Sequence, residues 1–309
     1  MRSARVLCQN PRVQYSRREF GALTLGALPA TALALVNRPA SAAAQITSRI
    51  KGVQIGAITY SFRSMADPND IIKAFVTIGL GEMEIMSGDV EKLVGAPTGR
   101  AERTSWRRSA TESTFAPVRA KIQQSGIDIA LLCYNMNVSS TTDDDIEYAF
   151  TMARGLGARA ISTSTQVSMA KRIAPFAARH RMRVGFHGHD SVDRADEVHN
   201  EASFKAVMDA GEYVGPNLDI GHFMVAGGDS IAFLKQYHAR ITNLHLKDKK
   251  RDGTNVAWGK GDTPIREVLQ LLSREKWDLP TNIEYVHEDP EGPVAGVTKC
   301  FQFMKDALA

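Results

Sequence analysis

Short apolar runs recur along the second half of the chain, and each leads directly into a histidine or an acidic residue. The runs end at Phe186, Leu218, Leu244 and Ile283, and the residues that follow are His187, Asp219, His245 and Glu284. The runs lie ~25–40 residues apart, about one strand–helix unit of an eight-stranded parallel barrel. Because such barrels gather the C-terminal ends of their strands around one mouth, we expect these four side chains to meet there.

The rest of the chain shows the same alternation of buried strands with helices of about 10–15 residues. Strands are predicted at 53–59, 82–86, 127–133, 158–162 and 183–186, ahead of the three that end at Leu218, Leu244 and Ile283. Helices are predicted at 68–78 and 115–124, from 141 to Gly155 or Gly157, and up to Arg179. Eight such units predict an α/β fold, a single (β/α)8 TIM barrel over residues 50–309, with no second domain.

Residues 87–112 interrupt this alternation. They are rich in Gly, Ser, Thr and Arg, contain Trp106, and show no clear hydrophobic period. We therefore predict a long loop, with a lid as one interpretation of its role.

The first 44 residues have the pattern of an export signal. Paired arginines lie in residues 16–20, an Ala/Leu/Gly-rich stretch spans 21–36, and small residues follow at 40–42. This order is typical of a cleavable signal, and the arginine pair resembles the twin-arginine type. The apolar stretch is shorter than the ~20 residues of a membrane span. We predict a signal peptide at 1–44, a periplasmic or secreted protein, and no stable membrane association after cleavage.

Removing this segment changes the charge of the chain. Residues 1–44 hold six arginines and one acid, so the remaining chain has 32 basic and 33 acidic residues. A near-neutral protein has no electrostatic footprint for nucleic acid, and we expect none as a partner. Cys133 and Cys300 lie in apolar contexts and are expected to be buried free thiols.

Two of the four polar residues at the strand ends also have a simpler structural explanation. Asp219 could cap the next helix, and His245 could be a core histidine with a hydrogen-bond partner. Glu284 is harder to explain in this way, because an ionised carboxylate in a buried strand is costly without a partner. A shared divalent cation would satisfy all four side chains together, which predicts a metal site.

Three motifs resemble the sugar phosphate isomerase/epimerase superfamily, the xylose isomerase-like TIM barrels. They are LDIGH at 218–222, HLKD at 245–248 and IEY at 283–285, within a resemblance that covers about residues 50–305. The resemblance implies one divalent metal ion (Mn, Mg, Co or Zn) held by His187, Asp219, His245 and Glu284. It also implies that Glu84 and the loop Trp258–Asp262, which includes Lys260, lie beside the substrate.

One position departs from the pattern of the epimerases in this superfamily. They usually carry a second Glu on strand five, which pairs with the strand-eight Glu to move protons on opposite faces of the substrate. Here the position is His187, followed by Gly188 and His189. This His-x-His sequence is more similar to exported members and to the inosose dehydratase branch. We favour His187 as the ligand and His189 as a residue facing the substrate.

Further residues near the strand ends are candidates for proton transfer and substrate binding. His189, His222 or Glu284 could act as the base, and Lys247 could neutralise a developing alkoxide. Lys247 could equally be an exposed lysine of the basic run 247–251, in which Lys249, Lys250 and Arg251 are expected to be solvated. Tyr60, Phe62, Arg63 and Trp258 are candidate walls for a sugar, with core packing as the alternative for Phe62.

These residues favour a metal-dependent isomerase or epimerase acting next to a carbonyl of a sugar, keto-sugar or cyclitol. The alternative is a metal-dependent dehydratase or lyase, of the inosose dehydratase type or eliminating from 3-keto-glycosides. More remote alternatives are an AP endonuclease-like phosphodiesterase and a non-catalytic sugar-binding barrel. The expected partner is a small carbohydrate. A homo-oligomer is compatible with the sequence, which leaves the oligomeric state open.

Overall fold

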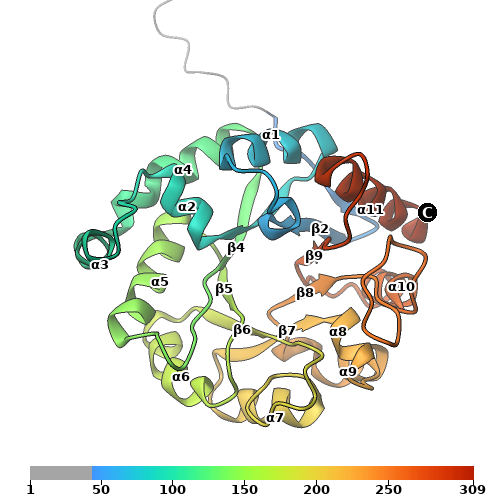
Figure 1. Ribbon diagram of the computed structural model, residues 1–309. Coiled ribbons are helices and arrows are strands. Elements are labelled where there is room, and N and C mark those ends of the chain that lie inside the picture. The colour runs from blue at the N-terminus through green and yellow to red at the C-terminus, as the bar shows by residue number, and fades with distance from the viewer. Residues whose placement is uncertain (1–43) are drawn as a thin grey trace, which may run out of the picture. The chain divides into compact units, whose positions relative to one another are not determined.

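The computed structural model describes residues 44–309, which form a closed barrel of eight parallel strands. The strands run around the barrel in chain order, and β9 pairs with β2 to close it (Figure 1). They are β2 (Val53–Ile58), β3 (Glu82–Met86), β4 (Asp128–Cys133), β5 (Ala160–Thr163), β6 (Arg183–His187), β7 (Val214–Asp219), β8 (Asn243–Leu246) and β9 (Thr281–Ile283). The predicted TIM barrel is therefore confirmed. The predicted export signal lies outside the described residues, apart from Ala44, and stays a prediction.

Helices surround the barrel on the outer side of the strands, as Figure 1 shows. They are α1 (Pro68–Ile78), α2 (Ser87–Leu93), α3 (Arg100–Ser109), α4 (Glu112–Gln124), α5 (Asp143–Leu156), α6 (Met169–His180), α7 (Glu201–Asp209), α8 (Ile220–Val225), α9 (Ser230–Tyr237), α10 (Ile265–Glu275) and α11 (Pro293–Leu308). Two short 3-10 helices, η1 (Thr59–Phe62) and η2 (His238–Arg240), and an unpredicted strand β1 (Arg49–Ile50), antiparallel to β2, complete the fold.

Local signals set the ends of several helices where the sequence predicts them. Helix α1 begins after Asp67, whose side chain accepts a hydrogen bond from the Asn69 amide, and ends at Gly79 in the left-handed conformation (φ 85°). A glycine adopts this backbone conformation without the steric cost of a Cβ atom. Helix α5 begins with a capping box between Thr142 and Asp145.

The prediction of a loop at 87–112 is wrong, because helices α2 and α3 occupy most of this segment. Helix α4 also begins at Glu112, earlier than predicted. Helix α3 buries none of its residues, so it has no apolar stripe from which a helical period could be recognised. Its Trp106 packs edge-on against Phe115 and Tyr148, at ring-centroid distances of 6.3 and 6.2 Å.

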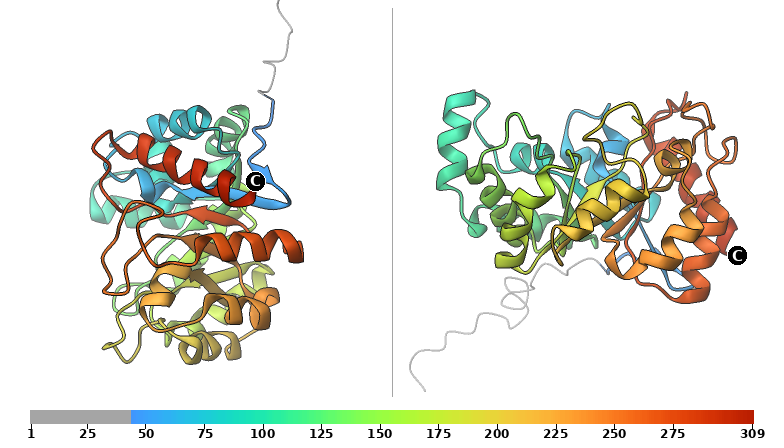
Figure 2. Two further views of the ribbon diagram at one scale, coloured as in Figure 1. Left: turned by 90° about the vertical axis from the view of Figure 1, so that its right-hand side faces the viewer. Right: turned by 90° about the horizontal axis from the view of Figure 1, so that it is seen from below.

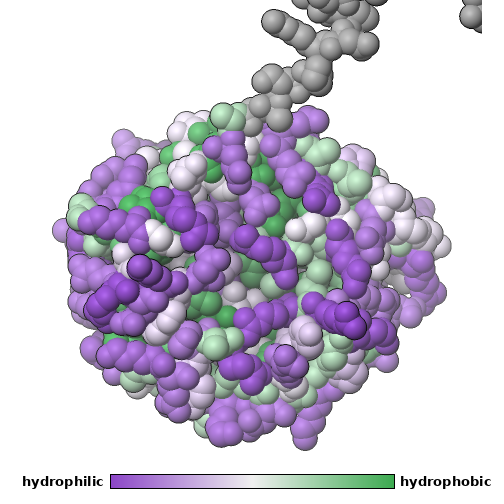
Figure 3. Space-filling model, turned by 180° about the vertical axis from the view of Figure 1, so that it is seen from behind, coloured by the Kyte–Doolittle hydropathy of each residue, from purple (hydrophilic) through white to green (hydrophobic). Residues whose placement is uncertain are grey.

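The loops that follow the strands gather at one end of the barrel. In the right-hand view of Figure 2, the long loops after β6 and β8 and the helix α3 project toward the upper side. Figure 3 shows the face opposite to that of Figure 1, where hydrophilic residues predominate and apolar residues form small patches. Among residues 44–309, no helix has the length and hydropathy that a membrane span requires. As predicted, Cys133 and Cys300 are free and buried.

Candidate metal centre

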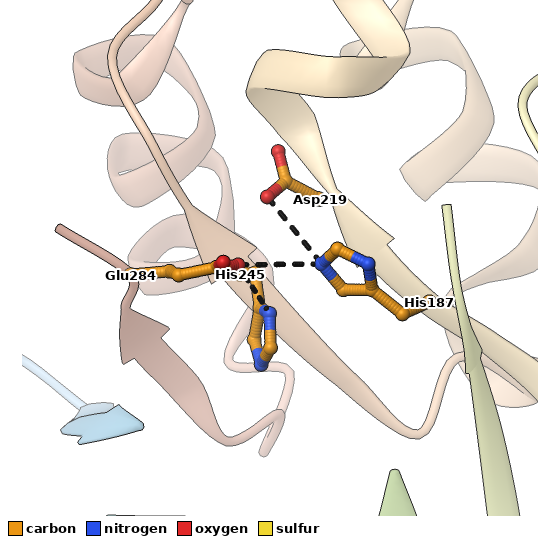
Figure 4. A group of neighbouring side chains, drawn as sticks. All are labelled: His187, Asp219, His245 and Glu284. Atoms are coloured by element: carbon orange, nitrogen blue, oxygen red, sulfur yellow. Dashed lines mark hydrogen bonds and ion pairs between the residues drawn. The ribbon is translucent and has the colours of Figure 1, made fainter. Parts of the chain in front are cut away.

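The four residues predicted as metal ligands meet at the C-terminal ends of neighbouring strands. In register, His187 of β6 lies beside Asn217 of β7, and Asp219 of β7 lies beside His245 of β8. Glu284 directly follows β9. One ligand atom from each of the four lies within 4.8 Å of all the others, and all four residues are buried (Figure 4). The predicted convergence of these four side chains at one end of the barrel is therefore observed.

The contacts within this cluster identify which atoms face its centre. His187 Nε2 lies 3.3 Å from Glu284 Oε2 and 3.6 Å from Asp219 Oδ2. His245 Nδ1 lies 2.9 Å from Glu284 Oε2. Two imidazole nitrogens and two carboxylates are a donor set that suits borderline divalent metals. Separations this short match atoms that would share one ion.

Asp219 caps the next helix with one carboxylate oxygen and faces the cluster with the other. Its Oδ1 caps α8, accepting hydrogen bonds from the amides of Gly221 and His222 at 2.9 and 2.8 Å. Its Oδ2 is fully buried and accepts no hydrogen bond. The Lys247 ammonium lies 3.2 Å from this oxygen and compensates part of the cost of burying it, and a metal ion shared by the four side chains would give the oxygen a direct ligand contact.

Glu84 lies beneath the cluster rather than beside a substrate, which corrects its predicted role as a substrate-binding residue. It is fully buried, and its Oε2 accepts from Asn282 Nδ2 at 2.7 Å and lies 2.8 Å from His245 Nε2. Burial alone would lower the pKa of His245, but the nearby Glu84 and Glu284 carboxylates outweigh it and raise the pKa to about 10. Glu84 thus holds the imidazole of a candidate ligand from its outer side.

The other candidate ligand histidine has its own partner. His187 Nδ1 lies 3.3 Å from His189 Nε2, and His189 Nδ1 lies 2.7 Å from Glu197 Oε1. Burial, together with the neighbouring His187, lowers the pKa of His189 to about 3, so its ring is neutral at pH 7. Glu197 had not been predicted as part of the site.

Lys247 lies inside the cluster, which rules out the alternative of an exposed lysine. Its ammonium lies 3.1 Å from Glu284 Oε1, 3.2 Å from Asp219 Oδ2 and 2.9 Å from His222 Nε2. Burial would lower the pKa of this lysine, but the carboxylates of Asp219 and Glu284 raise it above its usual range. Lys247 is therefore a protonated, buried cation beside two candidate ligands.

His222 and Lys249 extend this charged group outward. Burial lowers the pKa of His222, whose Nδ1 lies 3.2 Å from Asp190 Oδ2. The same carboxylate oxygen lies 2.7 Å from Lys249 Nζ. Lys249 is buried, so the prediction that it belongs to a solvated loop is wrong, whereas Lys250 and Arg251 are exposed as expected.

A cavity of about 500 Å³ opens at the cluster, and three of the four candidate ligands, His187, His245 and Glu284, line it. Tyr60 and Arg63 lie in its wall as predicted, and so do His189 and His222. Amide and hydroxyl side chains that had not been predicted also line it: Asn135, Thr163, Ser164, Asn217 and Asn255. These residues lie in loops or at strand ends without a motif of their own, so the sequence offered no signal for them.

Trp258 and Lys260 do not line this cavity, although the resemblance had placed their loop beside the substrate. Trp258 packs edge-on against Phe303 at 5.8 Å, and the amides of Gly259 and Gly261 donate to Asp248 Oδ2. This loop is therefore held by a buried aspartate. Phe62 is fully buried, in agreement with core packing, and no residue of the described insertion 87–112 reaches the cavity wall.

The closed parallel barrel with a His/Asp/His/Glu cluster at its C-terminal mouth defines a TIM barrel with a candidate metal centre. The chain belongs to the xylose isomerase-like TIM barrel family, whose family model matches residues 97–307. No curated protein has a sequence that matches this chain.

Several solved structures share the fold. The probable 3-DHS dehydratase AsbF, involved in petrobactin synthesis in Bacillus anthracis, is 15% identical with a TM-score of 0.62, covering 81% of this chain and 98% of its own. A sugar phosphate isomerase/epimerase from Parabacteroides distasonis is 14% identical with a TM-score of 0.60, covering 87% and 98%. The IolI protein, solved with a bound zinc atom, is 12% identical with a TM-score of 0.61, covering 82% and 98%. At these identities the similarity is one of fold.

Proposed function

We propose that this protein is a metal-dependent isomerase or epimerase that moves a proton next to a carbonyl of a sugar, keto-sugar or cyclitol. The observation that carries the proposal is the convergence of His187, Asp219, His245 and Glu284 beneath a polar cavity. These four residues would hold one divalent ion, Mn, Mg, Co or Zn, and the Asp219 oxygen that accepts no hydrogen bond is available as one of the ligands. When bound, such an ion acts as a Lewis acid that stabilises negative charge on a substrate oxygen.

The side chains around the centre supply the proton chemistry. Lys247 presents a buried ammonium that can neutralise or protonate a substrate oxygen, and its two carboxylate neighbours keep it charged. Glu284 lines the cavity and would be the carboxylate that takes a proton from a substrate carbon. His222 Nε2 lies against Lys247, so the lysine can exchange its proton with this imidazole.

The residues of the cavity wall support a carbohydrate as the substrate class. Amide and hydroxyl groups on several sides suit a ligand rich in hydroxyls. The volume of about 500 Å³ lies within the range of about 300–1,000 Å³ for small-molecule sites. Tyr60 adds an aromatic face, and the Arg63 guanidinium lies over it at 5.2 Å.

A dehydratase or lyase is the second candidate, and one observation favours it. Epimerisation with two carboxylates needs a second acid facing the substrate, but strand β6 ends in His187 and Glu84 is buried beneath the centre. A single carboxylate suits a one-base isomerisation or an elimination. The probable dehydratase AsbF among the structures with this fold is compatible with that choice.

Solvent deuterium incorporation tests the proposal for either reaction. The protein, with its metal content measured, is incubated in D2O with ketohexoses, inososes or 3-keto-glycosides, and the products are analysed by mass spectrometry. We expect metal-dependent exchange of a proton next to the carbonyl with at least one class. An Asp219→Ala variant should lose both metal and exchange. A purified wild type that binds no divalent metal would overturn the proposal.

We also propose that the protein is exported by the twin-arginine pathway and acts in the periplasm or outside the cell on a small carbohydrate. The pattern of residues 1–44 supports export, and the near-neutral charge of the remaining chain argues against nucleic acid as the partner. Replacing both Arg17 and Arg18 with Lys should retain the protein in the cytoplasm, as measured by cell fractionation. Unchanged export of that variant would contradict the proposal.

A further inference from the structure

We propose that Glu197 and His189 form a hydrogen-bonded chain that orients His187 for metal binding, a role that rests on the proposed metal centre. The chain runs from His187 Nδ1 to His189 Nε2 over 3.3 Å, and from His189 Nδ1 to Glu197 Oε1 over 2.7 Å. Glu197 is nearly buried, with a side chain 12% exposed. It therefore acts as a positioning residue two side chains away from the ion.

The donor and acceptor roles along these hydrogen bonds follow from which ring nitrogen of His187 faces the centre of the cluster. His187 Nε2 points toward Asp219 and Glu284, so a bound ion would take its lone pair and leave the proton on Nδ1. That N–H can donate only to an unprotonated His189 Nε2. The remaining His189 proton is then on Nδ1, where it donates to the Glu197 carboxylate. Each nitrogen in the chain has one role.

The backbone of the loop after β6 brings Glu197 to this position. The His189 amide donates to the Val198 carbonyl at 2.8 Å, and the Glu197 amide donates to the Arg194 carbonyl at 3.2 Å. The loop thus folds back on itself and places the carboxylate against the His189 ring. A carboxylate at the surface of a mobile strand end could not fix the ring in this way.

The arrangement parallels the one around the other candidate ligand histidine. His245 faces the centre with Nδ1 and contacts the Glu84 carboxylate through Nε2 at 2.8 Å. His187 reaches a carboxylate through one intervening imidazole. Both histidines are therefore connected by hydrogen bonds to a buried or nearly buried carboxylate. Such a carboxylate sets the ring orientation and makes the nitrogen that faces the metal a stronger ligand. In this account His189 supports the centre and is not a free base.

Metal affinity measured with Co(II) and Zn(II) by chelator competition tests the chain. We expect Glu197→Ala to weaken binding about 10–100-fold, the range for outer-shell partners, and Glu197→Gln, which keeps an acceptor, to weaken it less. The control is Asp193→Asn in the same loop, which removes an exposed charge that takes no part in the hydrogen bonds between Glu197, His189 and His187. A changed Co(II) absorption spectrum in Glu197→Ala would show an altered ligand field, which a purely structural role would not produce.

Non-additivity gives a second test with the same readout. If His189 transmits the effect, the double variant His189→Phe/Glu197→Ala should bind metal no more weakly than His189→Phe alone. Equal metal affinities of wild type, Glu197→Ala and Asp193→Asn would overturn the proposal that Glu197 orients His187, but they would not contradict the metal centre itself. Failure of the wild type to bind Co(II) or Zn(II) would instead overturn the proposed function.

Discussion

At the scale of single residues, the site depends on buried acids that do not each have a basic residue of their own. Glu84 is fully buried and satisfied by His245, Asn243, Asn282 and Ser162, so one carboxylate organises the polar interior beneath the cavity. Asp219 and Glu284 share one ammonium, that of Lys247. Such groups are costly to bury, and their concentration at one end of the barrel indicates a functional centre.

Replacing Glu84 with Ala should destabilise the metal-free protein by about 3–5 kcal/mol, because its buried donors lose their common acceptor and the charged His245 loses one of its two carboxylate partners. Glu84→Gln, of the same size, separates the loss of charge from the loss of volume. Urea unfolding of the metal-free variants gives the free energies. A loss below about 1 kcal/mol for Glu84→Ala would show that the carboxylate does not organise this interior.

Replacing Lys247 with Met should lower kcat by about 10²–10⁴-fold, the usual contribution of a positioned acid or base. Metal affinity should be kept or increased, since the ammonium lies against two oxygens of the candidate ligands. Lys250→Met, an exposed residue of the same basic run, is the control and should change neither quantity. If Lys247→Met retained full kcat on the identified substrate, the proton-transfer role of this lysine would be wrong.

At the scale of elements, the insertion 87–112 contains two helices, and a partly buried ion pair between them, Arg107 with Glu91, also contacts helix α5. Arg107 of α3 contacts Glu91 of α2 through two hydrogen bonds, of 2.8 and 3.2 Å. Tyr148 of α5 donates to the same carboxylate at 3.0 Å, and the guanidinium lies 5.4 Å from its ring centre. A single arginine thus joins three helices.

Arg107→Ala should therefore loosen α3 and leave Glu91 without its cation. We expect a destabilisation of about 2 kcal/mol, less than for a fully buried pair because Arg107 is partly exposed. Limited trypsin digestion should cut faster within α3. Arg108→Ala removes an exposed pair with Asp144 and an equivalent cleavage site, so it should leave the rate of cutting nearly unchanged. Equal rates for both variants would contradict this account.

At the scale of the whole molecule, the two ends of the barrel differ in the protonation of their buried acids. At the end opposite the candidate centre, burial raises the pKa of Glu82 to about 7, and its partner Arg159 opposes this only in part. The folded protein therefore holds a proton on Glu82 that the unfolded chain releases above about pH 4.5. This contribution to stability is present below pH 4.5 and is lost as the pH rises through 7.

Glu82→Gln should remove that dependence. The free energy of unfolding of Glu82→Gln minus that of wild type should increase by roughly 2–3 kcal/mol between pH 4.5 and pH 8, because only the wild type loses stability over this range. Urea titrations of the metal-free proteins at several pH values measure the difference. A difference that stays constant with pH would mean that Glu82 has an ordinary pKa in the folded protein.

The sequence predicts the barrel and the four candidate ligands because both depend on periodic features. Apolar runs at barrel spacing place His187, Asp219, His245 and Glu284 at equivalent strand ends, whatever the loops do. Helix α3 has no apolar period and was missed. Glu197 lies in an irregular loop, and only its backbone fold brings it to His189. Trp258 was misplaced because its motif fixes residue types but not the direction of the loop.

Anomalous diffraction from crystals soaked with Mn(II) or Zn(II) tests the central claim most directly. We expect one strong peak per protein molecule, enclosed by His187, Asp219, His245 and Glu284, with nitrogen and oxygen atoms at about 2.0–2.2 Å if the ion is zinc. Crystals of Asp219→Ala should lack that peak. A peak elsewhere in the wild type, or none at metal concentrations that saturate ordinary zinc sites, would contradict the account.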